Sequence, residues 1–120
     1  MIPRSNRFRG RASLRFVYQN GRTVRGPLFS IKSTVNPKRR SYRASVVVSR
    51  KVSKSAVVRN RIRRRLYSAL GRLDADIVEP YDIVITVFHD TAATEPAEKL
   101  SNQLKNQLKE AGILAKRVTG

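Results

Sequence analysis

The sequence predicts an α+β fold, a two-layer α/β sandwich with the element order α-β-β-α-β-α in one domain of residues 1–120. Residues 28–35 and 42–49 alternate apolar and polar side chains, which is the period of a half-buried strand. Residues 55–70 instead repeat their apolar side chains every three or four positions, as an amphipathic helix does. Residues 81–88 are apolar on both faces, which is typical of a central buried strand.

The first half of the chain supplies one helix and two strands. Residues 1–10 are basic and polar and are expected to form a loose arm. Residues 11–20 are expected to form a helix with Leu14, Val17 and Tyr18 on one face, closed by Gly21. The two following strands are expected to pair as an antiparallel hairpin across a turn at residues 36–41. Their apolar faces are Phe29, Ile31 and Val35, and Ala44, Val46 and Val48.

The second half supplies the longest helix, the buried strand and a final helix. Ser53 or Ser55 is expected to cap the helix of residues 55–70. Thr94 is expected to cap the final helix, which Gly112 ends. The apolar stripes of the two helices are Val58, Ile62, Leu66, Ala69 and Leu70, and Leu100, Leu104, Leu108 and Ala111. We expect the helices to cover one face of the sheet. One further short strand is also expected, but the sequence does not indicate its position.

Charge is distributed very unevenly along the chain. The 120 residues include 26 Lys and Arg against 8 Asp and Glu, a formal net charge of +18. The first acidic residue is Asp74, so residues 1–73 carry 21 basic side chains and no carboxylate. Such an imbalance destabilises a compact domain unless a polyanion relieves it. Arginine outnumbers lysine, and its planar group suits bidentate phosphate contact and base stacking, so we predict a nucleic-acid partner rather than a membrane.

The residue types that are absent exclude several protein classes. There is no cysteine, which removes disulfides, thiolate nucleophiles and cysteine-based zinc sites. No apolar run reaches the roughly 18–20 residues of a membrane span, and the first residues do not resemble a signal peptide. His89 is the only histidine, and with Asp82 and Asp90 it is expected to be structural. We therefore expect a cytoplasmic binding protein with no catalytic residue, metal or cofactor of its own.

The strongest motif lies on the helix of residues 55–70. At 100° per residue Ile62 points into the core, while Asn60 and five arginines cover the remaining surface. These arginines are Arg59, Arg61, Arg63, Arg64 and Arg65. Ordinary solvated helix faces mix both signs of charge, whereas this one has no Asp or Glu nearby. Arg50, Lys51 and Lys54 extend the basic surface toward the N-terminal end of the helix, where free N–H groups favour an anion.

These features favour RNA over DNA. A cationic helix fits a DNA major groove, but nothing here resembles a helix-turn-helix partner, a zinc finger or a leucine zipper. Arginine-rich helices without such a frame are typical of structured RNA recognition. Aromatic residues of the basic half are candidates either to stack on unpaired bases or to fill the core, whereas Tyr81 and Phe88 are expected in the core. The candidates are Phe8, Phe16, Tyr18, Phe29 and Tyr42.

Residues 48–66, VSRKVSKSAVVRNRIRRRL, closely resemble the signature of the bacterial ribonuclease P protein subunit, roughly V-S-K-K-x-G-x-A-V-x-R-N-R-x-K-R. The arginine–asparagine–arginine core of that signature stands at Arg59, Asn60 and Arg61, and Ser53 replaces a usual glycine. Residues 16–22, 80–84 and 108–114 match the same family in order and spacing, so the resemblance covers most of the chain.

The resemblance implies both a fold and an activity. The fold is that of ribosomal protein S5 domain 2, with a left-handed strand–helix–strand crossover, although such crossovers are right-handed in about 98% of cases. The activity is removal of the 5′ leader from precursor tRNA by a ribonucleoprotein whose RNA subunit performs Mg²⁺-dependent hydrolysis. The implied partners are the catalytic RNA and precursor tRNA, with no membrane and no obligate protein partner.

The resemblance also assigns roles to residues. The arginine-rich helix and the loop before it would hold the catalytic RNA through Arg50, Lys51, Lys54, Arg59, Asn60, Arg61, Arg63, Arg64 and Arg65. The cleft between the first helix and the sheet would receive the leader through Leu14, Phe16, Tyr18 and Lys32. Many relatives carry an aromatic residue at Leu14 and near Lys32, so stacking there is expected to be weaker or shifted. The alternatives are a small basic ribosomal or other structural RNA-binding protein and a nuclease that acts without RNA.

Overall fold

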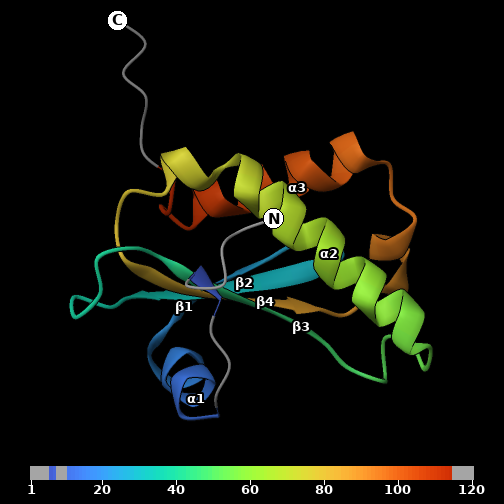
Figure 1. Ribbon diagram of the computed structural model, residues 1–120, viewed down its shortest axis with the longest axis horizontal. Coiled ribbons are helices and arrows are strands. Elements are labelled where there is room, and N and C mark those ends of the chain that lie inside the picture. The colour runs from blue at the N-terminus through green and yellow to red at the C-terminus, as the bar shows by residue number, and fades with distance from the viewer. Residues whose placement is uncertain (1–5, 8–10, 115–120) are drawn as a thin grey trace, which may run out of the picture.

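The computed structural model describes residues 6–7 and 11–114, without the side chains of residues 11–13. A four-stranded sheet forms the middle of the molecule, and helices lie on both sides of it (Figure 1). The elements are α1 (Arg11–Asn20), β1 (Arg22–Arg25), β2 (Phe29–Val35), β3 (Arg43–Val48), α2 (Ala56–Arg72), the short 3-10 helix η2 (Asp74–Asp76), β4 (Tyr81–Val87), a second 3-10 helix η3 (Asp90–Ala93) and α3 (Ala97–Glu110). Most of the expected loose arm lies outside the described residues.

The strand order is β1-β2-β4-β3, which corrects two expectations. β1 is the short strand that the predicted order lacked, and it forms an antiparallel hairpin with β2. The expected hairpin of β2 with β3 is wrong, because β4 lies between them, antiparallel to β2 and parallel to β3. Ile85 of β4 pairs with Ile31 on one side and Val46 on the other. A strand that is apolar on both faces is stable in the centre of a sheet, which explains the insertion.

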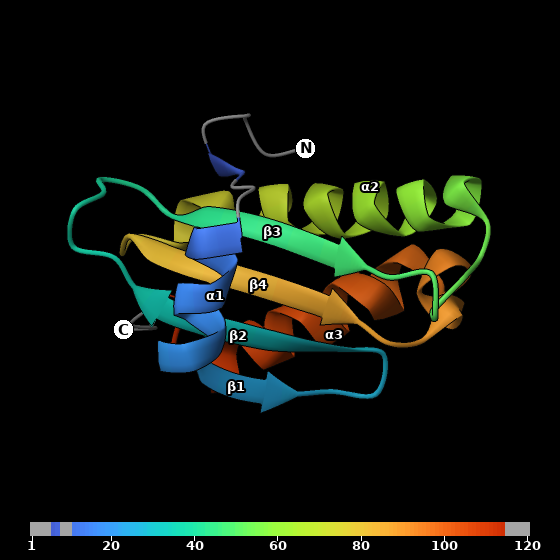
Figure 2. The same ribbon diagram turned by 90° about the horizontal axis from the view of Figure 1, so that it is seen from below.

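Helices cover both faces of the sheet, so the expectation that they cover one face is wrong. α2 and α3 lie on one face, and α1 crosses the other (Figures 1 and 2). The sequence of β4 explains the position of α1, because Val84 points to the face opposite Ile85 and is fully buried against Val17 of α1. Leu14 and Val47 pack against this second, smaller cluster.

The chain passes from β3 through α2 to the parallel strand β4. In Figure 2 both strands point to the right, β4 lies below β3, and α2 runs behind the sheet. A chain that follows this path turns in the left-handed sense, against the usual preference for right-handed crossovers. This is the sense that the family resemblance implies.

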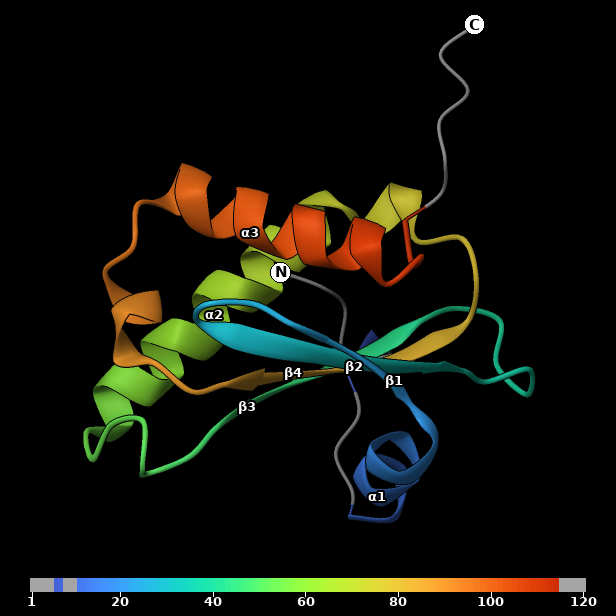
Figure 3. The same cartoon turned by 180° about the vertical axis from the view of Figure 1, so that it is seen from behind.

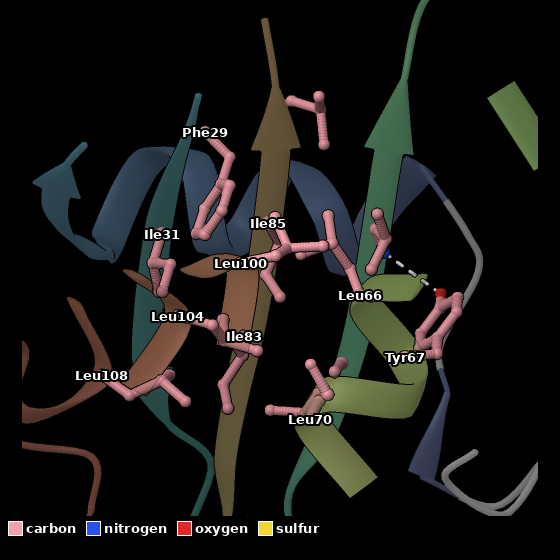
Figure 4. Close-up of a cluster of buried hydrophobic side chains, with 14 of the residues drawn as sticks. Phe29, Ile31, Leu66, Tyr67, Leu70, Ile83, Ile85, Leu100, Leu104 and Leu108 are labelled. Atoms are coloured by element: carbon pink, nitrogen blue, oxygen red, sulfur yellow. Dashed lines mark hydrogen bonds between the residues drawn. The ribbon is translucent and has the colours of Figure 1, made fainter. Parts of the chain in front are cut away.

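The main core lies between the sheet and the pair α2 and α3 (Figure 4). The predicted stripes of both helices are confirmed, with Val58 only partly buried at the start of α2. Tyr67 is an addition to the α2 stripe, because its ring is buried and its hydroxyl oxygen accepts a 3.1 Å hydrogen bond from the Val46 N–H. The largest fully buried side chains include Phe29, Ile31, Ile62, Leu66, Leu70, Ile83, Ile85, Leu100, Leu104 and Leu108.

The helix ends follow local signals, with one exception. Ser55 caps α2 as predicted, since its hydroxyl oxygen accepts a 3.3 Å hydrogen bond from the Val58 N–H. Thr94 does not cap α3: it ends η3, and Pro96 precedes the first turn of α3 without a side-chain cap. The fixed φ of proline suits a residue that leads into a helix. Gly112 has a φ of 76°, the left-handed conformation that commonly ends helices.

Two apolar side chains expected in the core are exposed. Val35 is 47% exposed at the end of β2, and Phe88 is 37% exposed just after β4. The guanidinium carbon of Arg25 lies 4.8 Å from the centroid of the Phe88 ring. Both residues stand where a strand ends, so the alternation of the strand no longer fixes their burial.

The turn between β1 and β2 is attached to α3 by Gln107. Its side-chain amide is buried and donates hydrogen bonds to the backbone oxygens of Phe29, at 3.0 Å, and of Val24, at 3.4 Å. A Cβ atom added to Gly26 would overlap this amide. The glycine therefore allows the turn to approach α3 closely.

We predict that Gly26→Ala lowers the free energy of unfolding by about 1–3 kcal/mol, because Gln107 must withdraw and leave buried carbonyl groups unsatisfied. Urea unfolding monitored by circular dichroism measures the change. Gln107→Ala removes the obstacle, so adding Gly26→Ala in that background should cause little further loss. A full additional loss in the double variant would show that Gly26 is required for another reason.

Candidate nucleic-acid interface

The buried stripe of α2 fixes which way each signature residue points. Arg61 and Arg65 lie on the side that faces α3. Arg59 lies on the other side, over the loop that precedes the helix. Asn60 and Arg64 are exposed and point away from the core. This is the arrangement that the helical spacing predicts.

Two of the signature arginines make hydrogen bonds close to their own position in the chain. Arg59 donates to the backbone oxygen of Ser53 at 2.9 Å, and Arg63 donates to the side-chain oxygen of Asn60. Both arginines are partly buried along the flank of the helix. Their guanidinium groups are therefore held in place before any ligand binds.

Arg65 connects α2 to the segment that leads into α3. Its guanidinium group donates to the backbone oxygens of Ala92, at 2.8 Å, and of Glu95. The two carbonyl groups lie 27 and 30 residues away in the sequence, so no local pattern indicates this contact. Arg65 thus has a role inside the fold that the sequence did not reveal.

The remaining basic residues of the motif are exposed. Arg61 and Arg64 make no hydrogen bond or ion pair with other described residues. Arg50, Lys51 and Lys54, in the loop between β3 and α2, are likewise exposed. Their charged groups are available to a ligand without breaking a contact within the described part of the protein.

Carboxylates of the second half do not neutralise α2. Asp74 accepts a hydrogen bond from the hydroxyl of Tyr42, and burial together with this carboxylate raises the pKa of Tyr42 well above its ordinary value. Asp82 is buried and accepts two 2.9 Å hydrogen bonds from Arg43. Among the described residues no salt bridge includes an arginine of α2. No carboxylate among the described residues therefore pairs with the positive charge of the helix.

The expected leader residues lie on the opposite side of the sheet, on and beside α1 (Figure 2). Tyr18 is 41% exposed, and the Lys32 ammonium lies 5.8 Å from the centroid of its ring. Phe16 is 52% exposed on the other flank of α1, because the intervening Val17 is buried. Leu14 is partly buried against the sheet. The structure thus brings Tyr18 and Lys32 together and separates Phe16 from them.

Phe16 instead lines a surface hollow at one end of the sheet. The hollow is built from the end of β2, the turn that follows it and the first residues of β3 and β4, including Val35, Asn36, Pro37, Lys38, Arg43 and Asp82. These segments are far apart in the sequence, which is why no motif indicated the hollow. Of the other aromatic candidates, Phe29 and Tyr42 are buried in the core, and Phe8 lies outside the described residues.

His89 and Asp90 have structural positions at the start of η3. The Nδ1 atom of His89 lies 3.2 Å from the Thr91 backbone N–H, from which it accepts a hydrogen bond. Within the ranges 6–7 and 11–114, no three His, Asp or Glu side chains gather where they could hold a metal ion. None of the helices in those ranges is long and apolar enough to cross a membrane.

Arg72 is a basic residue of α2 that the sequence prediction did not include. α2 continues through Gly71 to Arg72, two residues beyond the predicted end. Eleven residues are close to three helical turns, so Arg72 lies on the same side of α2 as Arg61. Both residues line a hollow between α2 and α3. The helical spacing from Arg61 would have indicated this position if the helix had been predicted to its full length.

We predict that Arg65→Ala lowers the free energy of unfolding by about 1.5–3 kcal/mol, the range for hydrogen bonds from a charged group. Arg61→Ala is the matched control, since it removes the same side chain from the same side of α2 without removing an internal hydrogen bond. Urea unfolding at one salt concentration compares the two variants. Equal stability would contradict the structural role of Arg65.

Known proteins resemble this chain over nearly its whole length. Residues 2–112 match the family described as Ribonuclease P. The ribonuclease P protein component of Pseudanabaena sp. (strain PCC 6903) is 37% identical over 115 residues, covering 95% of this chain and 97% of the relative. The ribonuclease P protein component of Chloroflexus aurantiacus (strain ATCC 29366 / DSM 635 / J-10-fl) is 36% identical over 112 residues, covering 92% and 81%.

Solved structures share the fold, an α+β arrangement with a mixed four-stranded sheet. The RNase P protein of Staphylococcus aureus superimposes with a TM-score of 0.81 at 24% identity, covering 91% of this chain and 97% of that one. The RNase P protein of Thermotoga maritima gives 0.77 at 22% identity, covering 87% and 96%. The chain therefore belongs to the ribonuclease P protein family, the protein component that partners with ribonuclease P RNA in the endoribonuclease that processes tRNA 5′ ends.

Proposed function

We propose that the protein holds the ribonuclease P RNA with α2 and the preceding loop, and the 5′ leader of precursor tRNA on the α1 face of the sheet. The observation that carries the proposal is the set of α2 arginines without a carboxylate partner among the described residues. In this proposal the RNA subunit performs the Mg²⁺-dependent hydrolysis in the cytoplasm, and the protein positions RNA and substrate.

The RNA contact begins with the exposed arginines Arg61 and Arg64 and continues into the loop with Arg50, Lys51 and Lys54. Phosphate contacts from such side chains release counterions from the RNA, which supplies much of the affinity. Asn60 lies among these arginines on the solvent side and can hydrogen-bond to sugar or base edges. These residues lie in the loop and in the first half of α2, which follow each other directly in the chain.

Arg59, Arg63 and Arg65 support the same surface from within the fold. Each guanidinium group has five N–H donors, and the internal hydrogen bonds use only one or two of them. The remaining donors can reach a phosphate while the bonded ones keep the group in place. A group held in this way loses less side-chain entropy when RNA binds.

The same charges destabilise the free protein. Arg59 with Arg63, and Arg61 with Arg65, are like-charge pairs four residues apart, each costing an isolated helix about 0.2–0.5 kcal/mol. A bound phosphate reverses the sign of that interaction. The proposed complex therefore relieves a repulsion that the free protein carries.

The leader contact uses the pair Tyr18 and Lys32. A half-exposed ring can stack on an unpaired base, and the ammonium beside it can contact the adjoining phosphate. Leu14 helps to attach α1 to the sheet, and Phe16 offers a second exposed ring on the other flank of the helix. A single-stranded leader that crosses α1 would meet the two rings at different nucleotides.

We predict that Arg61→Gln and Arg64→Gln each weaken binding of ribonuclease P RNA and reduce its salt dependence. The slope of log affinity against log salt should fall by about one for each lost phosphate contact. Arg22→Gln is the matched control, because Arg22 is an exposed arginine on β1, the edge strand at the opposite end of the sheet from β3, the strand that α2 contacts. Slopes that match the unmodified protein for both α2 variants would overturn the proposed RNA contact.

We predict that Tyr18→Ala reduces the affinity of the reconstituted enzyme for precursor tRNA with a long leader by about 1–3 kcal/mol, the range for loss of one stacked base. Binding of mature tRNA should stay unchanged, since it has no leader. Tyr18→Phe keeps the ring and should retain most of the affinity for precursor. An equal loss for precursor and mature tRNA would show that Tyr18 acts through the fold.

A further inference from the structure

A hollow lies between residues of α2 and α3. Figures 1 and 3 show these two helices next to each other on the same face of the sheet. The hollow extends beyond the signature motif toward the C-terminal end of α2. Its lining residues are Arg61, Arg64, Arg65, Ser68, Ala69, Arg72, Ala97, Leu100 and Ser101.

Small side chains create the hollow. Ser68 and Ala69 from α2 and Ala97 and Ser101 from α3 line it. These side chains are too small to fill the space between the two helices. The apolar residues at its floor, Ala69 and Leu100, are already 5% and 2% exposed. Little apolar surface is left for an apolar partner to cover, and the two hydroxyl groups offer hydrogen bonds.

Positive charge lines one wall of the hollow along about 16 Å of helix, from Arg61 to Arg72 at 1.5 Å per residue. Arg61, Arg64 and Arg72 are exposed and have no salt bridge among the described residues. None of the lining residues is acidic, although α3 begins near Glu95 and Glu98. The hollow is therefore a channel that is cationic along α2, and Ser101 is the polar residue among those that α3 contributes to it.

We propose that this channel holds a stretch of the ribonuclease P RNA backbone, with Arg72 contacting phosphate and Ser101 hydrogen-bonding to the same strand. The inference rests on the proposed function and extends it, because Arg72 and Ser101 lie outside the signature. A polyanion matches the charge of the wall, and the hydroxyl groups of Ser68 and Ser101 can hydrogen-bond to its backbone. The RNA footprint thus runs along α2 to its last residue and onto α3.

Substitutions at Ser101 test the inference with a matched pair. Ser101→Glu and Ser101→Gln introduce side chains of equal length, and both residues favour helices. The carboxylate would face Arg72 and repel phosphate, so Ser101→Glu should bind ribonuclease P RNA roughly tenfold more weakly than Ser101→Gln. Thermal unfolding of both variants establishes that they fold equally well. Equal RNA affinity of the two variants would overturn the inference.

Arg72→Gln provides a second, independent measurement on ribonuclease P RNA alone, without precursor tRNA. The slope of log affinity against log salt should fall by about one, as for a lost phosphate contact. Arg50→Gln serves as the reference for the proposed function, because Arg50 is an exposed residue of the loop before α2 and does not line the hollow. If Arg50→Gln weakens binding while Arg72→Gln leaves affinity and slope unchanged, the channel is not an RNA site and the proposed function stands. A loss from Arg72→Gln that appears only with precursor tRNA would likewise overturn the assignment to ribonuclease P RNA.

Discussion

The packing of one side of α2 against the sheet and α3 determines which residues this helix presents to solvent. Ile62, Leu66 and Leu70 are fully buried in the core beneath this helix. Their burial fixes the rotation of α2 about its axis, and this rotation decides where every arginine of the signature points. Because the stripe occupies one side only, the remaining surface of the helix is free to carry charge.

The arginines of α2 divide into two groups by their contacts. Arg59, Arg63 and Arg65 are held by hydrogen bonds inside the protein, whereas Arg61, Arg64 and Arg72 are exposed without a salt bridge among the described residues. The hydrogen bonds of the first group hold its guanidinium groups in place. The second group carries positive charge that forms no salt bridge with the described carboxylates. A rigid surface with unsatisfied charge loses little entropy on binding and relieves repulsion when phosphates arrive.

β4 separates the two faces on which we propose binding. Its side chains alternate between the main core, with Ile83 and Ile85, and the smaller cluster beneath α1, with Val84. The strand is buried on both faces, so a helix layer is needed on each side of the sheet. The basic helix and the exposed aromatic residues of α1 therefore lie on opposite sides of one sheet. In the proposed function, these two sides hold the RNA subunit and a single-stranded leader at the same time.

The sequence by itself determined the helices, three of the four strands, the apolar stripes and the basic side of α2, because these depend on local periodicity and on charge that lacks a nearby partner. Only the tertiary structure decided the strand order, the position of α1, the exposure of Phe88 and the internal role of Arg65. These features depend on contacts between distant segments: β4 lies between β2 and β3, and Arg65 binds carbonyl groups 27 and 30 residues away. A one-dimensional pattern carries no record of which distant backbone groups will be adjacent, so burial and hydrogen bonding across the fold decide them.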